Sequence, residues 1–578
     1  MPAIVTDLSA ETLARELESF LAEHPGAAVL EDARVLFDMR EARYALSAEH
    51  GRCVLQLWSE ERNIVRTVTG LDVRKDALRL QVRRFGQTRP QMLHLLADRD
   101  QRTPSTRAAI RSRYLKQLEH LLPRAFGDWK IEALRGSMDL EHSFGPAYAR
   151  GVLTRGQSAW ALIAVNAEES QATIDGILTL GLLWLNRCRE RAGNPRGGHA
   201  RHVEGLRVIV PEGHAAVTQS RMGWLDAAPA KWELYECDAR GDELRPLEIG
   251  RNGNLEMRLV QNFDRAAASE RLQAGVALVL ALVPDGARER VEQRVHSASA
   301  VGLSLYGLEF ARVQHGLAPG SFQRQDKITF GAGPNETELN EETAPMLRDL
   351  TARLFKSRHT AGSARDPLYR MQPERWLESR LSAALSEVEH SLLAAPVYRQ
   401  VPAFVASDRG MLDLLAVNRD GRLAVVELKA DEDLHMVLQG LDYWIRVHRA
   451  AQSRAVDGSN DFTRSGYFPG IRLAETSPLL YFVAPALRIH PATETVLRYL
   501  SGEIEWNLIA VGEAWRRSLE VIWRKRAGAN QPSRSAKAAT GSSIIPGAVG
   551  SDAISSALKR SAKNCSTASR IAGPVRAS

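Results

Sequence analysis

Residues 410–444 constrain the fold of this chain more than any other stretch. Residues 411–415 form a short apolar run that one acid, Asp413, interrupts, and residues 418–421 (NRDG) are typical of a turn. Residues 423–429 (LAVVELK) form a second apolar run that ends in charges. The pattern predicts a strand, a turn and a strand, followed by a helix that Asp431 and Asp433 cap. The helix stripe comprises Leu434, Val437, Leu438, Leu441 and Ile445.

The charges in the two predicted strands are the informative part. A carboxylate inside an apolar run is costly to bury unless it is paired or binds a metal. Asp413 and Glu427 lie near the same end of consecutive strands, and Glu427 and Lys429 point to the same face because strand side chains alternate. Two carboxylates and an ammonium on one surface suit Mg²⁺. Lys429 would orient a water nucleophile or stabilise charge on a scissile phosphate.

This order of residues, an acid followed one hairpin later by E-x-K and a helix, resembles the PD-(D/E)XK nuclease superfamily. The ELK sequence, followed by Gln439 and Tyr443, is most similar to the NucS-type branch of structure-specific DNA endonucleases. The resemblance implies a restriction-endonuclease-like mixed β-sheet flanked by helices. It also implies that Asp413 and Glu427 bind metal, that Lys429 is catalytic and that Gln439 lines the site. The first motif lacks the family's proline.

The family also has a glutamate on a helix that precedes the hairpin. Residues 370–393 predict such a helix, and both Glu374 and Glu378 lie beside its apolar stripe. The resemblance implies that one of them faces the site and binds metal. We choose Glu378, with Glu374 as the second choice. An ordinary solvated glutamate at either position is the alternative.

With 578 residues, the chain exceeds what one hydrophobic core usually supports. We expect a multidomain α/β (α+β) protein. The predicted divisions are an N-terminal helix with an antiparallel β module (residues 1–103), a middle α/β region (104–355), a linker (356–370), the nuclease domain (371–526) and a disordered basic tail (527–578).

Charge and composition indicate a cytoplasmic protein. No apolar run is long enough to span a membrane, no secretory signal is visible, and the four cysteines are scattered. The net charge is +7, but the residues from Arg524 onward contribute ten basic side chains and one acid, or +9. The rest is therefore 7 − 9 = −2, so a DNA-binding face on the body must come from local clustering of charge.

The middle region shows the same order of predicted elements as the C-terminal domain. If residues 160–170 are laid over residues 423–433, Ala164 falls on Glu427 and Asn166 on Lys429, while Arg150 falls on Asp413 at the same offset. We therefore hypothesise a degenerate nuclease-like lobe without its metal carboxylates, retained for DNA binding or packing.

The sequence predicts a DNA endonuclease that depends on Mg²⁺ or Mn²⁺, is structure-specific and acts in DNA repair or defence. The alternatives are a non-catalytic DNA-binding or scaffold protein with a nuclease fold, and a sequence-specific restriction-type enzyme. DNA is the expected partner and a membrane is not. The sequence does not decide whether the substrate is DNA or RNA, whether the chain forms a homodimer, or whether repair or defence proteins are its partners.

Overall fold

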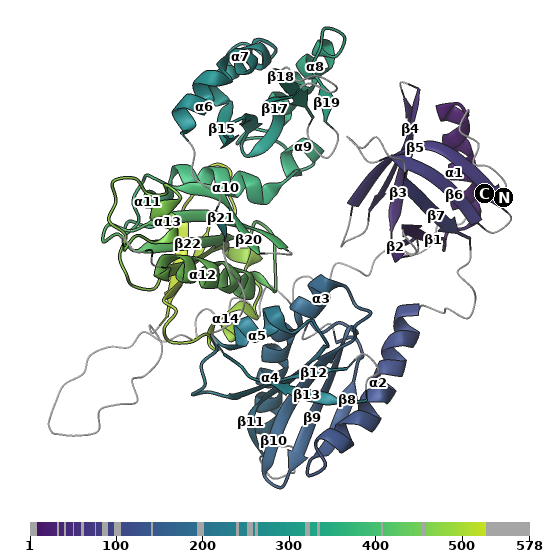
Figure 1. The fold of residues 1–578 in the computed structure, drawn as a ribbon, viewed down its shortest axis with the longest axis vertical. Helices are drawn as coiled ribbons and strands as arrows, with labels where there is room; N and C mark the ends of the chain where they lie inside the picture. Colours follow the sequence, from purple (N-terminus) through teal and green to yellow (C-terminus); the bar gives the residue numbers. More distant parts are fainter. Residues whose placement is uncertain are drawn as a thin grey trace, which may run out of the picture. The chain divides into compact units, whose positions relative to one another are not determined.

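The computed structural model describes residues 8–527 with gaps at 32–33, 40–41, 50, 59–62, 75–76, 84–90, 98–105, 140–142, 194–200, 239–241, 251–257, 260–263, 318–323, 332–335, 406–407, 454 and 456–457. In this part the chain mixes helices with four β-sheets (Figure 1). None of its helices has the length and apolar character needed to cross a bilayer. The tail predicted to be disordered lies outside the described residues, apart from Ala527.

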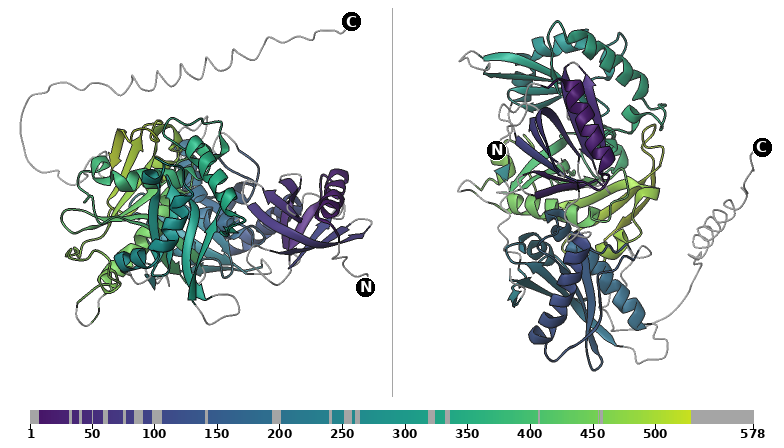
Figure 2. Two further views of the ribbon diagram at one scale, coloured as in Figure 1. Left: turned by 90° about the horizontal axis from the view of Figure 1, so that it is seen from above. Right: turned by 90° about the vertical axis from the view of Figure 1, so that its right-hand side faces the viewer.

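The first sheet is antiparallel and belongs to the N-terminal module. Its seven strands have the order β2-β1-β7-β6-β5-β4-β3. Helix α1 (Ala10–Glu23) packs on one face (Figure 2) through Leu13, Leu17 and Phe20, which are buried. The strands are β1 (Ala28–Glu31), β2 (Arg34–Asp38), β3 (Arg43–Glu49), β4 (Arg52–Trp58), β5 (Asn63–Arg74), β6 (Ala77–Arg83) and β7 (Gln91–Leu96). Alternate residues of β4 and β6 are buried, as the period of two in their sequences predicts.

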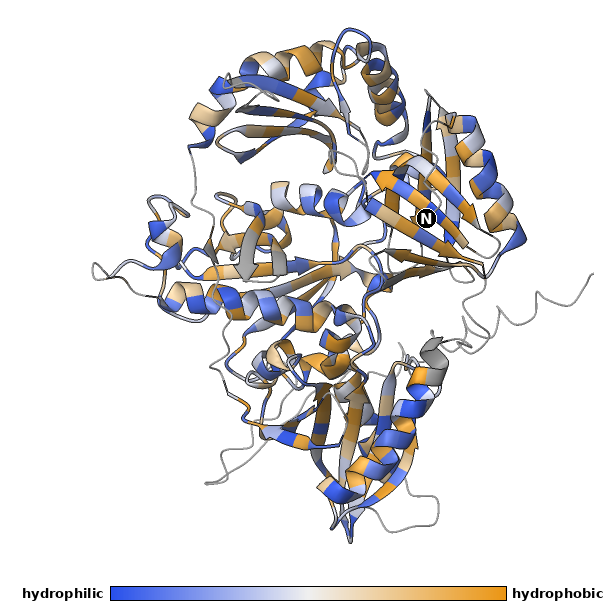
Figure 3. Ribbon diagram, turned by 45° about the vertical axis from the view of Figure 1, so that its right-hand side comes forward, coloured by the Kyte–Doolittle hydropathy of each residue, from blue (hydrophilic) through white to orange (hydrophobic). Residues whose placement is uncertain are grey.

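The second sheet lies in residues 106–247, which we call the middle lobe. Its six strands follow chain order, β8 to β13, and Figure 3 shows them as largely hydrophobic, beside the helix of residues 106–125, which alternates hydrophilic and hydrophobic along its length. The elements are α2 (Thr106–Ala125), β8 (Lys130–Arg135), β9 (Tyr148–Arg155), β10 (Ser158–Val165), α3 (Gln171–Asp175), α4 (Ile177–Gly193), β11 (His202–Pro211), α5 (Ala216–Met222), β12 (Lys231–Cys237) and β13 (Leu244–Leu247).

The third sheet has five strands and a hydrophobic core of its own, so the predicted 104–355 region comprises two sheets. Its elements are α6 (Arg265–Arg271), α7 (Gln273–Ala281), a 3-10 turn η2 (Arg288–Arg290), β15 (Glu292–Ser297), β16 (Ala300–Leu305), β17 (Leu308–Leu317), β18 (Arg324–Phe330), β19 (Thr337–Glu338) and α8 (Ala344–Ser357). The predicted linker is packed: Arg358 is fully buried and donates to the main-chain carbonyls of Leu305, Tyr306, Leu368 and Met371.

The fourth sheet is mixed and belongs mainly to residues 373–526, the C-terminal lobe. Its order is β14-β20-β21-β22-β23-β24-β25. The elements are β14 (Arg258–Leu259), α9 (Pro367–Arg370), α10 (Pro373–Ala383), α11 (Leu385–Val388), β20 (Tyr398–Val405), β21 (Asp408–Val417), β22 (Leu423–Leu428), α12 (Met436–Gln452), α13 (Asp461–Arg464), β23 (Leu479–Pro485), η3 (Ala486–Arg488), α14 (Thr493–Leu497), β24 (Trp506–Val511) and β25 (Val521–Arg526). The helix predicted over 370–393 is thus interrupted at Ala384.

Helix α12 lies close against the fourth sheet because a glycine faces the strands. A Cβ on Gly440 would lie 2.5 Å from Phe482 Cε1 and 3.3 Å from Glu427 Cβ. Any side chain here would push the helix away from β22. The helix begins at Met436, later than the caps predicted from Asp431 and Asp433, because Asp433 pairs with Lys429 instead and accepts a hydrogen bond from the His435 amide.

Candidate active site

The site lies where β21, β22 and α12 meet, and Asp413 is its first acid. Asp413 Oδ2 accepts a hydrogen bond from the Leu428 amide at 3.1 Å, which fixes the carboxylate against β22. Its Oδ1 lies 3.3 Å from Nε2 of Gln400, a buried residue with φ 50°. Burial, together with the negative charge of Glu378, raises the pKa of Asp413 to about 6.

Glu427 is the second acid and is almost completely buried. Burial, and then the nearby Asp413 carboxylate, raise its pKa well above the ordinary value. Its Oε2 is buried without a hydrogen-bond partner among the described residues. A buried carboxylate oxygen left in this way is unfavourable unless a cation or proton occupies the position beside it.

Helix α12 contributes two further side chains. Gln439 precedes the glycine that faces Glu427, and its Oε1 is also buried without a partner in the described part of the chain. Tyr443 lies one turn further along. Burial raises the pKa of its phenol, and the negative charges of Glu427 and Asp413 raise it further. Tyr443 therefore remains a neutral hydroxyl beside the two acids.

Lys429 is surrounded by acids. Its Nζ lies 3.3 Å from Glu427 Oε1, 3.4 Å from Asp433 Oδ2 and 4.0 Å from Glu374 Oε1. Burial lowers the pKa of Lys429, but the three carboxylates outweigh it and the pKa is raised. The side chain is therefore a fixed cation and not a general base.

The two glutamates of α10 differ in their surroundings. Glu378 is buried, with Oε1 accepting from Arg399 Nε at 2.9 Å and Oε2 accepting from Gln400 Nε2 at 2.7 Å and from Arg375 at 3.0 Å. Both oxygens are thus engaged. Glu374 is half-exposed beside Lys429, and burial is the main cause of its raised pKa. The predicted choice of Glu378 as a metal ligand has little support in this geometry, which favours Glu374 as the accessible acid.

Two residues of the third sheet hold Arg399, the partner of Glu378, in place. Glu292 of β15 accepts a hydrogen bond from Arg399 at 3.1 Å, and Arg294 donates to the Arg399 carbonyl at 3.0 Å. Arg399 is therefore held between Glu378 and Glu292. Arg399 and Gln400 were not predicted, because a left-handed residue inside a regularly paired strand, as Gln400 is, has no signal in this sequence.

A divalent cation at this site would need several oxygen ligands. No three His, Cys, Asp or Glu side chains of the described ranges form a preformed metal site. Asp413 and Glu427 nevertheless supply carboxylate oxygens, and the unpaired oxygens of Glu427 and Gln439 are hard donors of the kind that Mg²⁺ prefers. The fit holds for these three residues and does not extend to Glu378.

No protein-family model matches this chain, and no curated protein matches it either.

Proposed function

We propose that the chain is a metal-dependent DNA endonuclease with a restriction-endonuclease-like C-terminal lobe. The observation that carries the proposal is the buried Asp413–Glu427 pair beside a fixed ammonium, with one oxygen of Glu427 lacking any partner among the described residues. Two acids with raised pKa values next to a cation are costly to the fold, so their presence supports a function at this place. The resemblance to PD-(D/E)XK nucleases names that function.

Each residue has a separate role in this mechanism. Asp413 and Glu427 hold Mg²⁺ or Mn²⁺, and Gln439 offers an amide oxygen. The bound cation supplies Lewis-acid polarisation of the phosphate and acidifies water. Lys429 places its ammonium where negative charge develops on the phosphate. Glu374, half-exposed beside Lys429, is available to accept a proton from water.

The reaction is hydrolysis of a phosphodiester. A water oxygen forms a bond to phosphorus, the bond from phosphorus to one sugar oxygen breaks, and the products are a phosphate end and a hydroxyl end. We propose a structure-specific substrate and a role in DNA repair or defence on the resemblance alone.

A cleavage assay on labelled DNAs tests the proposal. The panel holds single-stranded, duplex, mismatched, flapped and branched DNA, each with Mg²⁺, Mn²⁺ or EDTA. We expect metal-dependent cutting that Lys429→Ala and Asp413→Asn abolish, while Asp128→Asn, a change at a highly exposed acid, leaves it intact. DNA binding without cutting, equal in all variants, would instead favour the scaffold protein.

A further inference from the structure

The middle lobe and the C-terminal lobe are two copies of one topology. In each, three antiparallel strands come first, the third and fourth pair parallel, the fourth and fifth pair parallel, and the sixth returns antiparallel. Strands β8 to β13 thus correspond to β20 to β25. Helices α4 and α12 connect the third and fourth strands, and α5 and α14 connect the fourth and fifth.

The strand register shows what replaces the acids. Strands β11 and β23 both end in proline, Pro211 and Pro485, and these prolines occupy the same place when the sheets are matched. In the C-terminal lobe, Phe482 of β23 pairs with Glu427 of β22. Glu427 in turn lies opposite Asp413 of β21, because the neighbouring residues Val426 and Leu414 are paired. In the middle lobe it runs from Val208 to Ile163 and Arg150.

Arg150 therefore corresponds to Asp413, as the sequence suggested, but Ile163 and not Ala164 corresponds to Glu427. Ala164 packs in the core beneath α2, on the opposite face of the sheet from Ile163. By the same register Val165, rather than Asn166, corresponds to Lys429. The sequence alignment was one residue out because the chain from Asp413 to Glu427 advances 14 positions, whereas the chain from Arg150 to Ile163 advances 13.

A glycine on each helix supports this register independently. A Cβ on Gly181 of α4 would lie 3.1 Å from Ile163 Cγ2, just as one on Gly440 of α12 would lie 3.3 Å from Glu427 Cβ. With these glycines matched, Leu180 corresponds to Gln439. At the three matched positions the middle lobe therefore has Arg150, Ile163 and Leu180, none of which offers an oxygen to a cation.

The charge at the matching position is reversed. With the glycines matched, Trp184 corresponds to Tyr443, and three guanidinium groups lie over the Trp184 ring. Their distances to its centroid are 5.5 Å for Arg135, 6.0 Å for Arg150 and 5.8 Å for Arg191. Arg150 itself is buried and donates to the Ser137 and Gly145 carbonyls, so the positive charge that the middle lobe offers to a phosphate backbone comes from Arg135 and Arg191.

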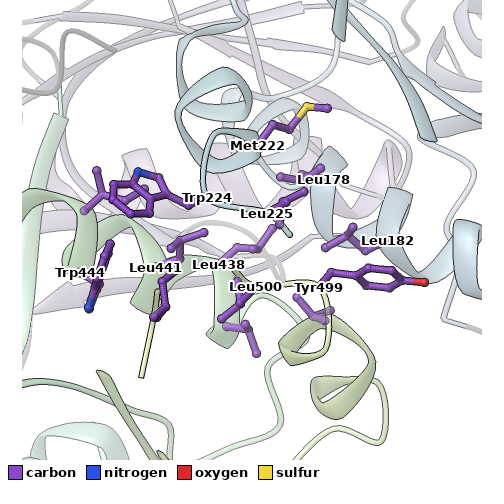
Figure 4. Packing of buried hydrophobic residues seen from close by; sticks show 14 of the residues in the cluster. Leu178, Leu182, Met222, Trp224, Leu225, Leu438, Leu441, Trp444, Tyr499 and Leu500 are labelled. Carbon is purple, nitrogen blue, oxygen red and sulfur yellow. The ribbon is translucent and has the colours of Figure 1, made fainter. Parts of the chain in front are cut away.

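The lobes meet through matching surfaces, as the two halves of a two-fold dimer do. Leu225 after α5 bridges Leu500 after α14 in antiparallel fashion. The flanking hydrogen bonds are reciprocal: Asp226 N donates to Tyr499 O at 2.9 Å, and Ser501 N donates to Trp224 O at 2.8 Å. Figure 4 shows this contact, with Trp224 and Leu225 packed against side chains of α12.

Ring contacts repeat the same reciprocity. His448 of α12 meets the Trp224 ring with centroids 5.1 Å apart, and Arg189, which corresponds to it on α4, lies over the Tyr499 ring at 5.9 Å. The surface of the C-terminal lobe around α12 and α14 is therefore covered by the matching surface of the middle lobe within the same chain.

We propose that this chain is an internally paired nuclease that breaks one strand of a DNA duplex in each binding event. The middle lobe takes the place of a second subunit and holds the duplex without hydrolysing it. The two strands of a DNA duplex are related by two-fold axes. If both lobes had an active site, each of the two sites would therefore meet one strand. Only one of the two centres has metal-binding oxygens. The inference rests on the function proposed above.

The test uses the full-length chain and a symmetric duplex whose two strands carry different fluorophores. A symmetric branched or mismatched duplex replaces it if only such structures are cut in the panel. Chain and DNA are mixed with EDTA, and Mg²⁺ is then added in excess together with unlabelled competitor DNA, so that one binding event is followed. We expect duplexes cut in either strand but not in both, and an initial rate proportional to the first power of the chain concentration.

The outcomes separate the two proposals. Concerted cutting of both strands within one binding event, or a rate that rises with the square of the chain concentration, overturns the internally paired nuclease and leaves the endonuclease standing. Cutting of single-stranded DNA alone, with every duplex substrate left intact, also overturns the internally paired nuclease. Absence of metal-dependent cutting on every substrate overturns both proposals. Sedimentation of the Lys429→Ala chain on the same DNA supplies a readout without catalysis, and we expect one chain per duplex.

Discussion

Arg221 of α5 and Asp442 of α12 form a two-point ion pair across the contact between the lobes. The Arg221 Nε and Nη2 atoms lie 2.9 Å and 2.7 Å from the two carboxylate oxygens of Asp442, and Arg221 also donates to the Asp175 carbonyl. Their side chains are only 8% and 19% exposed. Removing one partner from such a pair leaves an uncompensated buried charge.

We expect Asp442→Ala to lower the free energy of unfolding by about 3 kcal/mol. The double variant Arg221→Met/Asp442→Leu should recover most of this loss, because it removes both charges. Urea unfolding of the wild type and both variants measures the effect. A loss in the double variant as large as in the single one would show that the pair itself, and not an orphaned charge, stabilises the contact.

The metal-free site should oppose folding at neutral pH. The Asp413 carboxyl has an ordinary pKa of 3.8 and a folded-state pKa of about 6. Its contribution to stability is therefore fully present below pH 3.8 and is lost as the pH rises through 6. Asp413→Asn removes this titration and should stabilise the metal-free protein above pH 6 by up to about 3 kcal/mol. Urea unfolding in EDTA at pH 5 and pH 7.5 checks the prediction, and an equal gain at both would contradict it.

The same pKa predicts a pH dependence of metal binding. A cation must displace the proton from Asp413, and from Glu427, whose pKa burial raises well above its ordinary value. We expect Mn²⁺ affinity to fall steeply below pH 6 and binding at that pH to release protons. Calorimetric titration in two buffers of different ionisation enthalpy measures both. Affinity that is flat between pH 5 and pH 7 would exclude these two acids as the metal ligands.

The sequence could indicate the acids and the lysine because their placement is local. Alternation along a strand sets Glu427 and Lys429 on one face, and a short hairpin brings Asp413 beside them. Glu374 and Glu378 could not be separated in this way, since residues four apart share a helical face. The difference between them comes from Arg399 and Gln400, on a strand that lies beyond the next helix.

The residue-by-residue correspondence between the two lobes could not be predicted from the sequence for a related reason. The turn between β21 and β22 spans residues 418–422, and the one between β9 and β10 spans 156–157. One offset cannot match both strands of each hairpin. Only the cross-strand pairs, which depend on the folded sheet, place Ile163 at the position of Glu427.

Substitutions at Glu374 and Glu378 should have separate effects, one on the cleavage rate and the other on the free energy of unfolding. Glu378→Gln leaves the buried Arg399 with one fewer ionic partner, and we expect it to cost about 2 kcal/mol in the free energy of unfolding with little change in Mn²⁺ affinity. Glu374→Gln, its neighbour one turn away and half-exposed, should leave stability within about 0.5 kcal/mol and lower the cleavage rate. The reverse pattern, with cleavage lost at unchanged stability in Glu378→Gln, would restore Glu378 as the site residue.

The arginines around Trp184 should contribute to DNA binding and not to chemistry. We expect Arg135→Ala and Arg191→Ala each to weaken DNA binding in EDTA and to reduce the slope of log affinity against log salt by about 1. Their effect on Mn²⁺ affinity should be absent, because the cation binds in the other lobe. Arg353→Ala, an exposed arginine of α8 paired with Asp349, is the matched control for lost charge. Salt slopes equal to that of the control would mean that the positive charge of the middle lobe serves packing alone, and the DNA would then be held by the C-terminal lobe without it.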